Sequence, residues 1–584
     1  MEMKLVLAEK PRVAARIARV LGARPLRRFG VTYFVGDGVV VAPASGHLVQ
    51  YDYPEEVNRV WDYPAVLPLE GLVLRPVEGK RRYLRLLEAL SSRAEEVVVA
   101  TDLDAEGSAI GLELAEYLGW RRLLRAEFSS LSPRELREAF RRLRGFDYPR
   151  AFAGVVRQVL DLEWGANLTR ALTRAGRRAG LRLLLSAGRV QTPTLKLVVD
   201  REREIRSFRP EPYYLAEATF ESSSGTFKAT AGPFKEKPAL PRPGSSSRAK
   251  VTIRPSRVPP PPPFNGTDLQ TVVARLTGLS PRAIADRSRG IAQRLYEEGY
   301  ISYIGTSSRR WPRGWGRRDF ERMVELIARY PPLSGLARWV LRNMRDKPVE
   351  GRADDPAHPA VHVTGAPRRL ASPYREVYEL VARRCLAALA PDCLQRGWKV
   401  TVKVGGLEFE RAGVEVLEEG WRKVWPYDAP KSASPPAGDG EEVVLKSVRV
   451  VRKLTKPPPR YTPVSLIKRM EELGLGTKNT RPTIIDLLRR RGYIIVRRGR
   501  IYPTELGEMI VDLLSKHVPD ITSPSITAML ERGMYEIEVG KLSHSEFLER
   551  TLNQLRVIAT KLKENEPSLS REMKSLLSSR GKSA

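Results

Sequence analysis

The chain has 584 residues, of which 42% are apolar and 29% charged, and it is therefore long enough for several domains that each bury a core. Lys and Arg number 100 against 68 Asp and Glu, and the net charge of +32 attracts polyanions, with nucleic acid as the first candidate partner. Two cysteines are too few for a zinc ribbon, and neither a signal peptide nor an apolar run of about 18 residues is present, so we expect a cytoplasmic protein without membrane contact.

The first part of the chain alternates between strand and helix patterns. MKLVLAE, residues 3–9, is an apolar run typical of a buried strand, and residues 10–22 have helical apolar spacing that ends at a glycine. VVVA, residues 97–100, predicts a second buried strand, and residues 107–119 predict another amphipathic helix. Acidic residues follow both strands, and in open α/β sheets sites form at the carboxyl ends of strands.

An acidic turn, ATDLDAEG, follows the second strand. Asp102 and Asp104 lie two residues apart and share one face of an extended segment, with Glu106 behind them. Clustered carboxylates repel one another unless a cation lies between them, and oxygen ligands suit Mg²⁺. If the two strands are neighbours, Glu9 joins this cluster, and the combination resembles the pattern of the Toprim fold. The alternative interpretation is a solvated acidic loop.

Changes in composition mark the later boundaries. Residues 133–204 are mainly helical and rich in arginine, whereas β-like patterns appear after Tyr213 and around Trp398. These two β-like segments flank a helical block, residues 264–367, which a run of prolines precedes. The C-terminal third is helical, and its end, residues 561–584, is polar and expected to fray.

Tyr303 stands in the stretch EEGYISYIGTSSRR, between an acidic, helix-like turn and two arginines. The local pattern alone favours a strand tyrosine that packs one face of its ring and hydrates its hydroxyl. The other interpretation is a nucleophile at the edge of a cleft, and only the rest of the chain decides between the two.

Five stretches, in order along nearly the whole chain, resemble the signatures of type IA DNA topoisomerases. They are LSAGRVQTPTLKLVVDREREI (185–205), AQRLYEEGYISY (292–303), DDPAHPAVHVTG (354–365), and residues 461–494 and 521–541. The branch looks like topoisomerase III without zinc ribbons. The resemblance implies a multidomain α/β plus α+β fold, in which a Toprim domain and helical and β-rich domains are arranged as a torus.

The expected division of the chain follows from this resemblance. We expect a Toprim domain, a discontinuous helical DNA-binding domain, a discontinuous β-rich hinge domain, a tyrosine domain and a polar tail, over residues 1–148, 149–210 with 458–560, 211–263 with 368–457, 264–367, and 561–584. The implied partner is DNA, in single-stranded regions of negatively supercoiled duplex, and the implied state is a monomer. The excess of arginine over lysine fits phosphate binding, a GC-rich genome or a hot environment alike.

The resemblance also implies the reaction, in which one DNA strand is cleaved through a 5′-phosphotyrosine, another strand passes, and the break is resealed without ATP. Tyr303 takes the place of the nucleophile, Glu9 that of the acid–base group near the leaving 3′ oxygen, and Lys10 that of the cation on the scissile phosphate. His358 matches the histidine of the catalytic pocket. The implied ligands of the Mg²⁺ cofactor are Glu9, Asp102, Asp104 and Glu106.

Further residues match DNA-binding positions of the family. They are Ser186, Ala187, Gly188, Arg189, Val190, Gln191, Thr192, His47, Arg157, Asp161, Thr480 and Arg481. Arg157 and Asp161 lie four apart on a helix, so an ion pair between them is the plain alternative. SSRRWPRGWGRR interleaves tryptophan with arginine as single-strand binders do, although a solvated basic loop explains the same pattern.

Two departures from the family pattern concern arginines. Ile304 and Gly305 replace the Pro-Arg that follows the family's tyrosine, and Ala105 replaces the arginine of its acidic motif. Since an arginine stabilises charge on a reacting phosphate, its loss predicts a slow enzyme whose cleavage is more visible than its full relaxation cycle, and Gly305→Arg, ideally with Ile304→Pro, is expected to speed turnover. The alternative function is a cleavage-poor or non-enzymatic DNA-binding relative.

Overall fold

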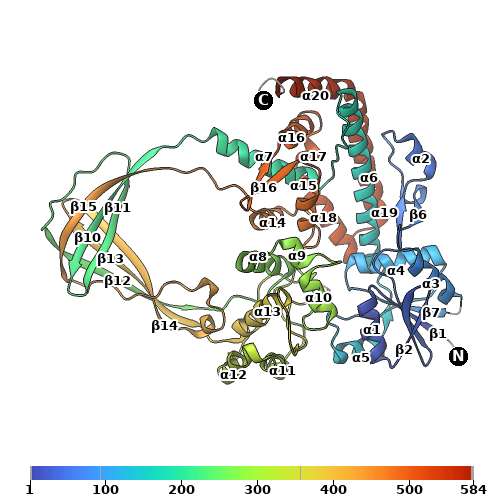
Figure 1. The fold of residues 1–584 in the computed structure, drawn as a ribbon, viewed down its shortest axis with the longest axis horizontal. Coiled ribbons are helices and arrows are strands. Elements are labelled where there is room, and N and C mark those ends of the chain that lie inside the picture. Colours follow the sequence, from blue (N-terminus) through green and yellow to red (C-terminus); the bar gives the residue numbers. More distant parts are fainter. Residues whose placement is uncertain (1–2, 93, 356, 581–584) are drawn as a thin grey trace.

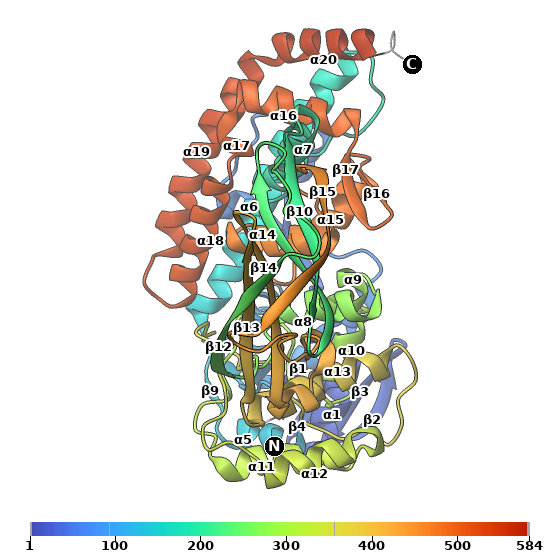
Figure 2. The same ribbon diagram turned by 90° about the vertical axis from the view of Figure 1, so that its left-hand side faces the viewer.

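A computed structural model describes residues 3–92, 94–355 and 357–580 (Figures 1 and 2). The N-terminal sheet lies at one end of the molecule in Figure 1 and a β-barrel at the other, with helices between them. Among the described helices, none is long and apolar enough to span a bilayer.

Within the described residues, seven strands form the N-terminal sheet, in the order β2-β3-β4-β1-β7-β8-β9. β1 (Met3–Ala8) is parallel to both of its neighbours, β4 (Val39–Pro43) and β7 (Ala94–Ala100). Its side chains from Leu5 to Ala8 are buried, as expected for a strand covered by helices on both faces. Because β1 and β7 are parallel neighbours, the acidic residues that follow them meet at one edge.

The other elements of this part flank that sheet. They are β2 (Arg24–Arg28), β3 (Val31–Gly36), β8 (Leu123–Arg125), β9 (Arg144–Gly145), a small sheet of β5 (Val49–Asp52) and β6 (Val73–Pro76), and the helices α1 (Pro11–Val20), α2 (Glu55–Val60), η1 (Leu69–Gly71), α3 (Arg81–Ser91), α4 (Ala105–Leu118) and α5 (Pro133–Arg141).

The helical part is built on α6 (Tyr148–Arg178), which packs in the same hydrophobic cluster as the C-terminal third of the chain. The remaining members are α7 (Gln191–Ser207), α14 (Pro463–Glu472), α15 (Arg481–Arg490), β16 (Ile494–Arg497), β17 (Arg500–Pro503), α16 (Glu505–His517), α17 (Pro519–Thr522), α18 (Pro524–Glu538), α19 (His544–Glu564) and α20 (Glu566–Arg580).

The C-terminal end differs from the frayed polar tail expected over residues 561–584. α20 is a helix, and Leu569 and Met573, one helical turn apart, are 0% exposed. These two apolar residues lie among polar ones, so composition alone hid a narrow apolar stripe that contacts α6 and α16. Residues 581–584 lie outside the described part.

A closed barrel forms the β-rich part, in the order β10-β11-β14-β13-β12-β15. Its strands are β10 (Pro212–Ser222), β11 (Gly225–Phe234), β12 (Ser246–Val258), β13 (Cys393–Val404), β14 (Leu407–Glu418) and β15 (Glu442–Leu454), with η3 (Gly420–Lys423) and η4 (Pro426–Asp428) after β14. Alternate residues of β10, namely Ala216, Ala218 and Phe220, point into the barrel core. The chain leaves the barrel after β12 and returns at β13.

The chain between those two strands forms the helical unit that carries Tyr303. It contains α8 (Gly266–Thr277), α9 (Pro281–Ala285), α10 (Ile291–Glu297), α11 (Arg317–Ala328), η2 (Pro331–Leu333), α12 (Ser334–Arg342) and α13 (Tyr374–Leu389). Residues 368–457 were expected to be β-rich, but α13 packs in the same hydrophobic cluster as Tyr303. The reason is its apolar helical spacing, in which Val377, Val381 and Cys385, four residues apart, are 0% exposed.

Candidate active site

Two strand ends bring the predicted carboxylates together. Glu9 follows β1 and is 3% exposed, while Asp102 follows β7 and is 2% exposed. The backbone N–H of Asp102 donates to Glu9 Oε2 at 3.2 Å. Asp104 caps α4, where its side chain accepts the Gly107 N–H at 2.7 Å. Gly107 is required here, because a Cβ would lie 2.2 Å from the carbonyl oxygen of Asp102.

Arg287, which the sequence did not reveal, lies among these carboxylates. Its Nη2 is 3.3 Å from Glu9 Oε1 and 3.4 Å from Asp102 Oδ2. Its Nη1 is 3.2 Å from Asp104 Oδ2 and also contacts Glu106. Nothing in its local sequence separates this arginine from the many others, because its partners lie more than 180 residues away in the chain.

The acidic cluster of Glu9, Asp102, Asp104 and Glu106 supplies the oxygen donors that Mg²⁺ prefers. Within the part of the chain that the structure describes, however, no group of three or more such side chains is arranged to hold a metal ion. The physical reason is the guanidinium of Arg287, which lies between the carboxylates. The oxygen donors of the acidic cluster therefore fit Mg²⁺ chemically. In their present arrangement they contact the guanidinium of Arg287.

Tyr303 is buried, with 1% of its surface exposed, and its hydroxyl donates to Asp104 Oδ2 at 2.7 Å. Its backbone N–H donates to the carbonyl of Ser129, which fixes this loop segment against the N-terminal part. The ring lies directly over Gly305, where a Cβ would be 2.5 to 2.7 Å from its atoms. Tyr303 is thus packed, as the local pattern indicated, but its hydroxyl points into the acidic cluster and not to water.

A second tyrosine, also missed by sequence reasoning, reaches the same cluster. The hydroxyl of Tyr296 donates to Asp102 Oδ1 at 3.1 Å, and its ring meets that of Tyr303 edge to face at 5.2 Å. The available signal was its position in AQRLYEEGYISY, in helix α10, which ends before Tyr303.

Two more predicted residues lie at this site, Lys10 beside Glu9 and His358 beside Tyr303. Lys10 Nζ lies 3.7 Å from Glu9 Oε1 and 3.5 Å from Glu297 Oε1. The ring of His358 lies 4.5 Å from that of Tyr303, and its Nδ1 is 3.3 Å from Ser129 Oγ. Lys10 Nζ and His358 Nε2 are buried and have no hydrogen-bond partner among the described residues. Both retain hydrogen-bonding capacity for a ligand.

Burial and the central guanidinium shape the ionisation of the site. Burial and the charge of Glu9 raise the pKa of Asp102 to about 8. Burial also opposes the charge of Asp104, but Arg287 and the Gly107 N–H outweigh it and lower the pKa to about 2. Burial raises the pKa of Tyr303 well above its usual range, against the attraction of Arg287. Burial lowers the pKa of His358 to about 4, so that its ring is neutral at pH 7.

The predicted DNA-binding arginines form a separate ionic network. Arg189 contacts Asp161 at 2.6 Å and Glu531 at 2.7 Å, and Arg157 contacts Glu531 at 2.9 Å. The alternative pairing of Arg157 with Asp161 is therefore wrong, because Glu531 of α18 and Arg189 at the start of α7 supply closer partners. Glu531 was not anticipated, since it lies 342 residues from Arg189 in sequence.

The rest of the predicted segment, residues 186–192, forms a closed turn before and into α7. Gln191 donates to Ser186 Oγ at 3.0 Å, and the Gly188 N–H donates to Thr192 Oγ1 at 3.3 Å. Ala187 and Val190 are buried in the helical core. The turn thereby holds the buried side chain of Arg189 between Asp161 of α6 and Glu531 of α18.

Of the remaining predicted residues, His47 and Thr480 make contacts within their own parts and Arg481 also makes one between parts. His47 Nδ1 is 2.7 Å from Glu113 Oε2, and its Nε2 is 3.9 Å from Glu106 of the acidic cluster. Thr480 Oγ1 accepts the Thr477 N–H at 2.8 Å. Arg481 donates to the carbonyl of Gly476 and to Thr267 Oγ1 of α8, which ties the helical part to the unit of Tyr303.

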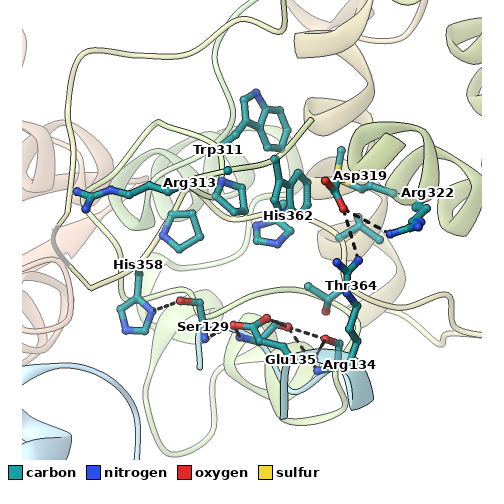
Figure 3. A pocket seen from close by; sticks show the side chains of 18 of the residues that line it. Ser129, Arg134, Glu135, Trp311, Arg313, Asp319, Arg322, His358, His362 and Thr364 are labelled. Atoms are coloured by element: carbon teal, nitrogen blue, oxygen red, sulfur yellow. Dashed lines mark hydrogen bonds and ion pairs between the residues drawn. The ribbon is translucent and has the colours of Figure 1, made fainter. Parts of the chain in front are cut away.

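A pocket beside His358 opens between residues 129–138 and residues 311–364 (Figure 3). Trp311 lines it but is 4% exposed and donates its indole N–H to the carbonyl of Val349. Its ring stacks with Trp315 at 6.3 Å. Trp311 of SSRRWPRGWGRR is thus buried and Trp315 partly buried, while Arg313 and Arg317 of the same stretch are exposed to solvent.

Comparison with known proteins agrees with this architecture. A family model described as DNA topoisomerase matches residues 147–549, and a Toprim domain model matches residues 4–131. DNA topoisomerase 1 of Pyrococcus horikoshii is 36% identical over 97% of this chain and 85% of its own length. DNA topoisomerase 1 of Aquifex aeolicus is 30% identical over 90% of this chain and 97% of its own length.

A solved structure supports the same assignment. Full-length topoisomerase I from Thermotoga maritima superimposes with a TM-score of 0.74 at 27% identity, over 94% of this chain and 89% of that one. In sequence and in three dimensions, this chain therefore agrees with DNA topoisomerases. The agreement covers the sheet with its acidic strand ends, the helices and the β-rich part. The chain belongs to the type IA DNA topoisomerases.

Proposed function

We propose that this type IA DNA topoisomerase cleaves a single DNA strand through Tyr303 and reseals it without ATP after strand passage. The observation that carries the proposal is the hydrogen bond from the Tyr303 hydroxyl to Asp104 Oδ2, made inside the acidic cluster. A phenol needs an acceptor for its proton and a cationic surrounding for the phosphate that it attacks. Asp104 is placed to accept the proton, while Lys10 and His358 have free polar atoms nearby.

The reaction exchanges one phosphodiester for another. The Tyr303 oxygen forms a bond to phosphorus, the bond to the 3′ oxygen breaks, and the Tyr303 proton passes to Asp104. The leaving 3′ oxygen takes up a proton from the adjacent pair of Glu9 and Asp102, in which Asp102 holds it at pH 7 because its pKa is raised to about 8. Religation is the reverse, and the phosphotyrosine conserves the bond energy.

We propose Mg²⁺ as the cofactor, held by Glu9, Asp102, Asp104 and Glu106. A bound divalent cation offsets the negative charge of the carboxylates and of the DNA phosphate. The residues predicted to bind DNA keep that proposed role, in which phosphates compete with Glu531 for Arg157 and Arg189.

Finer assignments are also proposals. The two cysteines of this sequence cannot complete a four-cysteine zinc ribbon, which favours the topoisomerase III-like branch. The proposed substrate is a single-stranded region of negatively supercoiled DNA, bound by a monomer in the cytoplasm. The proposed division into domains keeps the boundaries expected from the sequence, except that α13 and α20 belong to the helical cores they pack in.

The test compares Tyr303→Phe with Tyr300→Phe, which alters a partly buried tyrosine on the same segment that packs against Tyr378. After a denaturant quench, we expect Tyr303→Phe to give no covalent protein–DNA adduct and Tyr300→Phe to give one, while both bind single-stranded DNA. An adduct with Tyr303→Phe would assign the nucleophile elsewhere, with Tyr296 as the next candidate.

A further inference from the structure

Arg287 contacts several carboxylates, although the proposed function gives it no role. It pairs with all four members of the acidic cluster, which come from the ends of β1 and β7 and from the start of α4. Its side chain is 15% exposed, so water screens these pairs weakly. Glu9 and Asp102 are nearly fully buried, and such carboxylates need a cation beside them.

The backbone around Arg287 holds the side chain in this direction. The carboxylate of Asp286 accepts the N–H groups of Ser288 and Arg289 at 2.9 and 3.0 Å, which closes a tight turn between α9 and α10. Gly290 completes the turn, because a Cβ there would lie 2.5 Å from the Asp286 carbonyl oxygen. The arginine is therefore presented by a formed turn.

The oxygens that Arg287 contacts are the same ones that the proposed metal site needs. Mg²⁺ binds oxygens at about 2.1 Å, whereas the guanidinium keeps these carboxylates apart at nitrogen–oxygen distances of 3.2 to 3.4 Å. Two cations in one cluster also repel each other. Occupation by one disfavours the other for both steric and electrostatic reasons.

We propose that Arg287 is an internal counter-ion that competes with Mg²⁺ for the acidic cluster, so that the metal binds fully only when Arg287 has left. This inference rests on the proposed function, which places Mg²⁺ at these carboxylates. Arg287 and Tyr303 belong to the same helical unit, while the carboxylates belong to the N-terminal sheet. Separation of the two parts withdraws the arginine together with the nucleophile and exposes the metal ligands.

The test measures Mn²⁺ binding to the DNA-free protein by electron paramagnetic resonance, in the wild type, Arg287→Gln and Arg289→Gln. Arg289→Gln removes the same charge from the same turn at an exposed position. We expect Arg287→Gln to bind Mn²⁺ about tenfold more tightly or better, which is the size of effect that a like charge has on an ionisation at this range. We expect Arg289→Gln to match the wild type.

A second readout and a second variant complete the test. Without metal, Arg287→Gln is expected to melt below the wild type, and Mn²⁺ is expected to restore it by more than it stabilises the wild type. Arg287→Lys keeps the charge but loses the planar fork, and its affinity should lie between the two. Affinity equal to or weaker than wild type in both Arg287 variants overturns the inference alone. Absence of Mn²⁺ binding in every variant overturns both the inference and the proposed metal site.

Discussion

Gly305 lies directly beneath the ring of Tyr303. The sequence suggested that an arginine there would restore a cation and speed turnover. In the structure the ring of Tyr303 fills the space over Gly305, with its hydroxyl 2.7 Å from the position of a Cβ. A side chain at residue 305 meets the ring of Tyr303, which must shift and so disturbs its hydrogen bond to Asp104 before any electrostatic gain.

We therefore expect Gly305→Ala to slow formation of the covalent adduct by about tenfold or more, because the ring loses its aligned position. Affinity for single-stranded DNA should change little. Gly335→Ala is the control, because a Cβ there meets nothing within 4 Å. Single-turnover cleavage measures the rate, and a Gly305→Arg variant faster than wild type would show that the ring moves aside readily.

His362 supplies a prediction about pH. Burial lowers the pKa of this histidine to about 4, against the carbonyl of Ala360, whereas the unfolded chain titrates near 6.5. Between these values the unfolded state binds a proton that the folded state refuses, so the free energy of unfolding falls as pH is lowered through that window. We expect His362→Gln to lose less stability than the wild type between about pH 7 and pH 4.5.

Urea unfolding at each pH measures this difference. His544 is the control, because it is only partly buried and stacks on Phe152 at the edge of α19. His544→Gln should change the pH dependence less than His362→Gln does. Equal pH dependence in the wild type and His362→Gln would show that His362 takes up a proton without unfolding.

At the scale of elements, one carboxylate joins three helices. Glu531 of α18 contacts Arg157 of α6 and Arg189 at the start of α7, and these arginines lower its pKa to about 2 against the effect of burial. The side chain of Arg189 is only 3% exposed and has two carboxylate partners. Loss of Glu531 leaves this buried guanidinium with Asp161 alone. We expect Glu531→Gln to lower the free energy of unfolding by roughly 3 kcal/mol.

The measurement is thermal or urea unfolding, beside Glu549→Gln on the exposed face of α19 as control. Single-stranded DNA should restore much of the lost stability if its phosphates take the place of the carboxylate at the two arginines. A stability loss that DNA does not reduce would mean that Arg157 and Arg189 only hold the helices together.

The elements also show what a sequence can predict. The strands at residues 3–8 and 97–100 and their acidic ends were predictable, because a buried strand and the turn that follows it are local patterns. Arg287 and Glu531 were not, because their partners lie far away in the chain and only the fold brings them together. Tyr296 was missed although it stands in the same motif as Tyr303. α20 was missed because its apolar stripe is narrow, and α13 because boundaries were placed by composition.

At the scale of the whole molecule, the unit of Tyr303 meets the N-terminal sheet along α1 and α10. Arg12 contacts Glu298 at 2.9 Å, and Arg16 donates to the carbonyl of Glu297 at 2.8 Å. The same unit is continuous with the barrel through β12 and β13 (Figure 1). In the proposed strand passage, these contacts with α1 break while the covalent connections to the barrel persist.

We expect Arg16→Ala to shift the population toward the separated form, because a buried carbonyl loses its donor in the joined form. Dyes on cysteines introduced at Arg137 and Arg338 report the separation by energy transfer; the native Cys385 and Cys393 are 0% exposed and escape labelling. Arg59→Ala, in an exposed pair within α2, is the control. Unchanged transfer efficiency in Arg16→Ala would place the controlling contact elsewhere.

The burial of Tyr303 protects DNA from unintended cleavage by such an enzyme. A protein able to break DNA is a hazard whenever its reactive group meets a strand by chance. Here the hydroxyl is hidden, with 1% of the residue exposed, and burial keeps it protonated. A DNA strand that meets the protein by chance therefore does not reach the hydroxyl. Cleavage requires a strand that is bound firmly enough to open the protein around it.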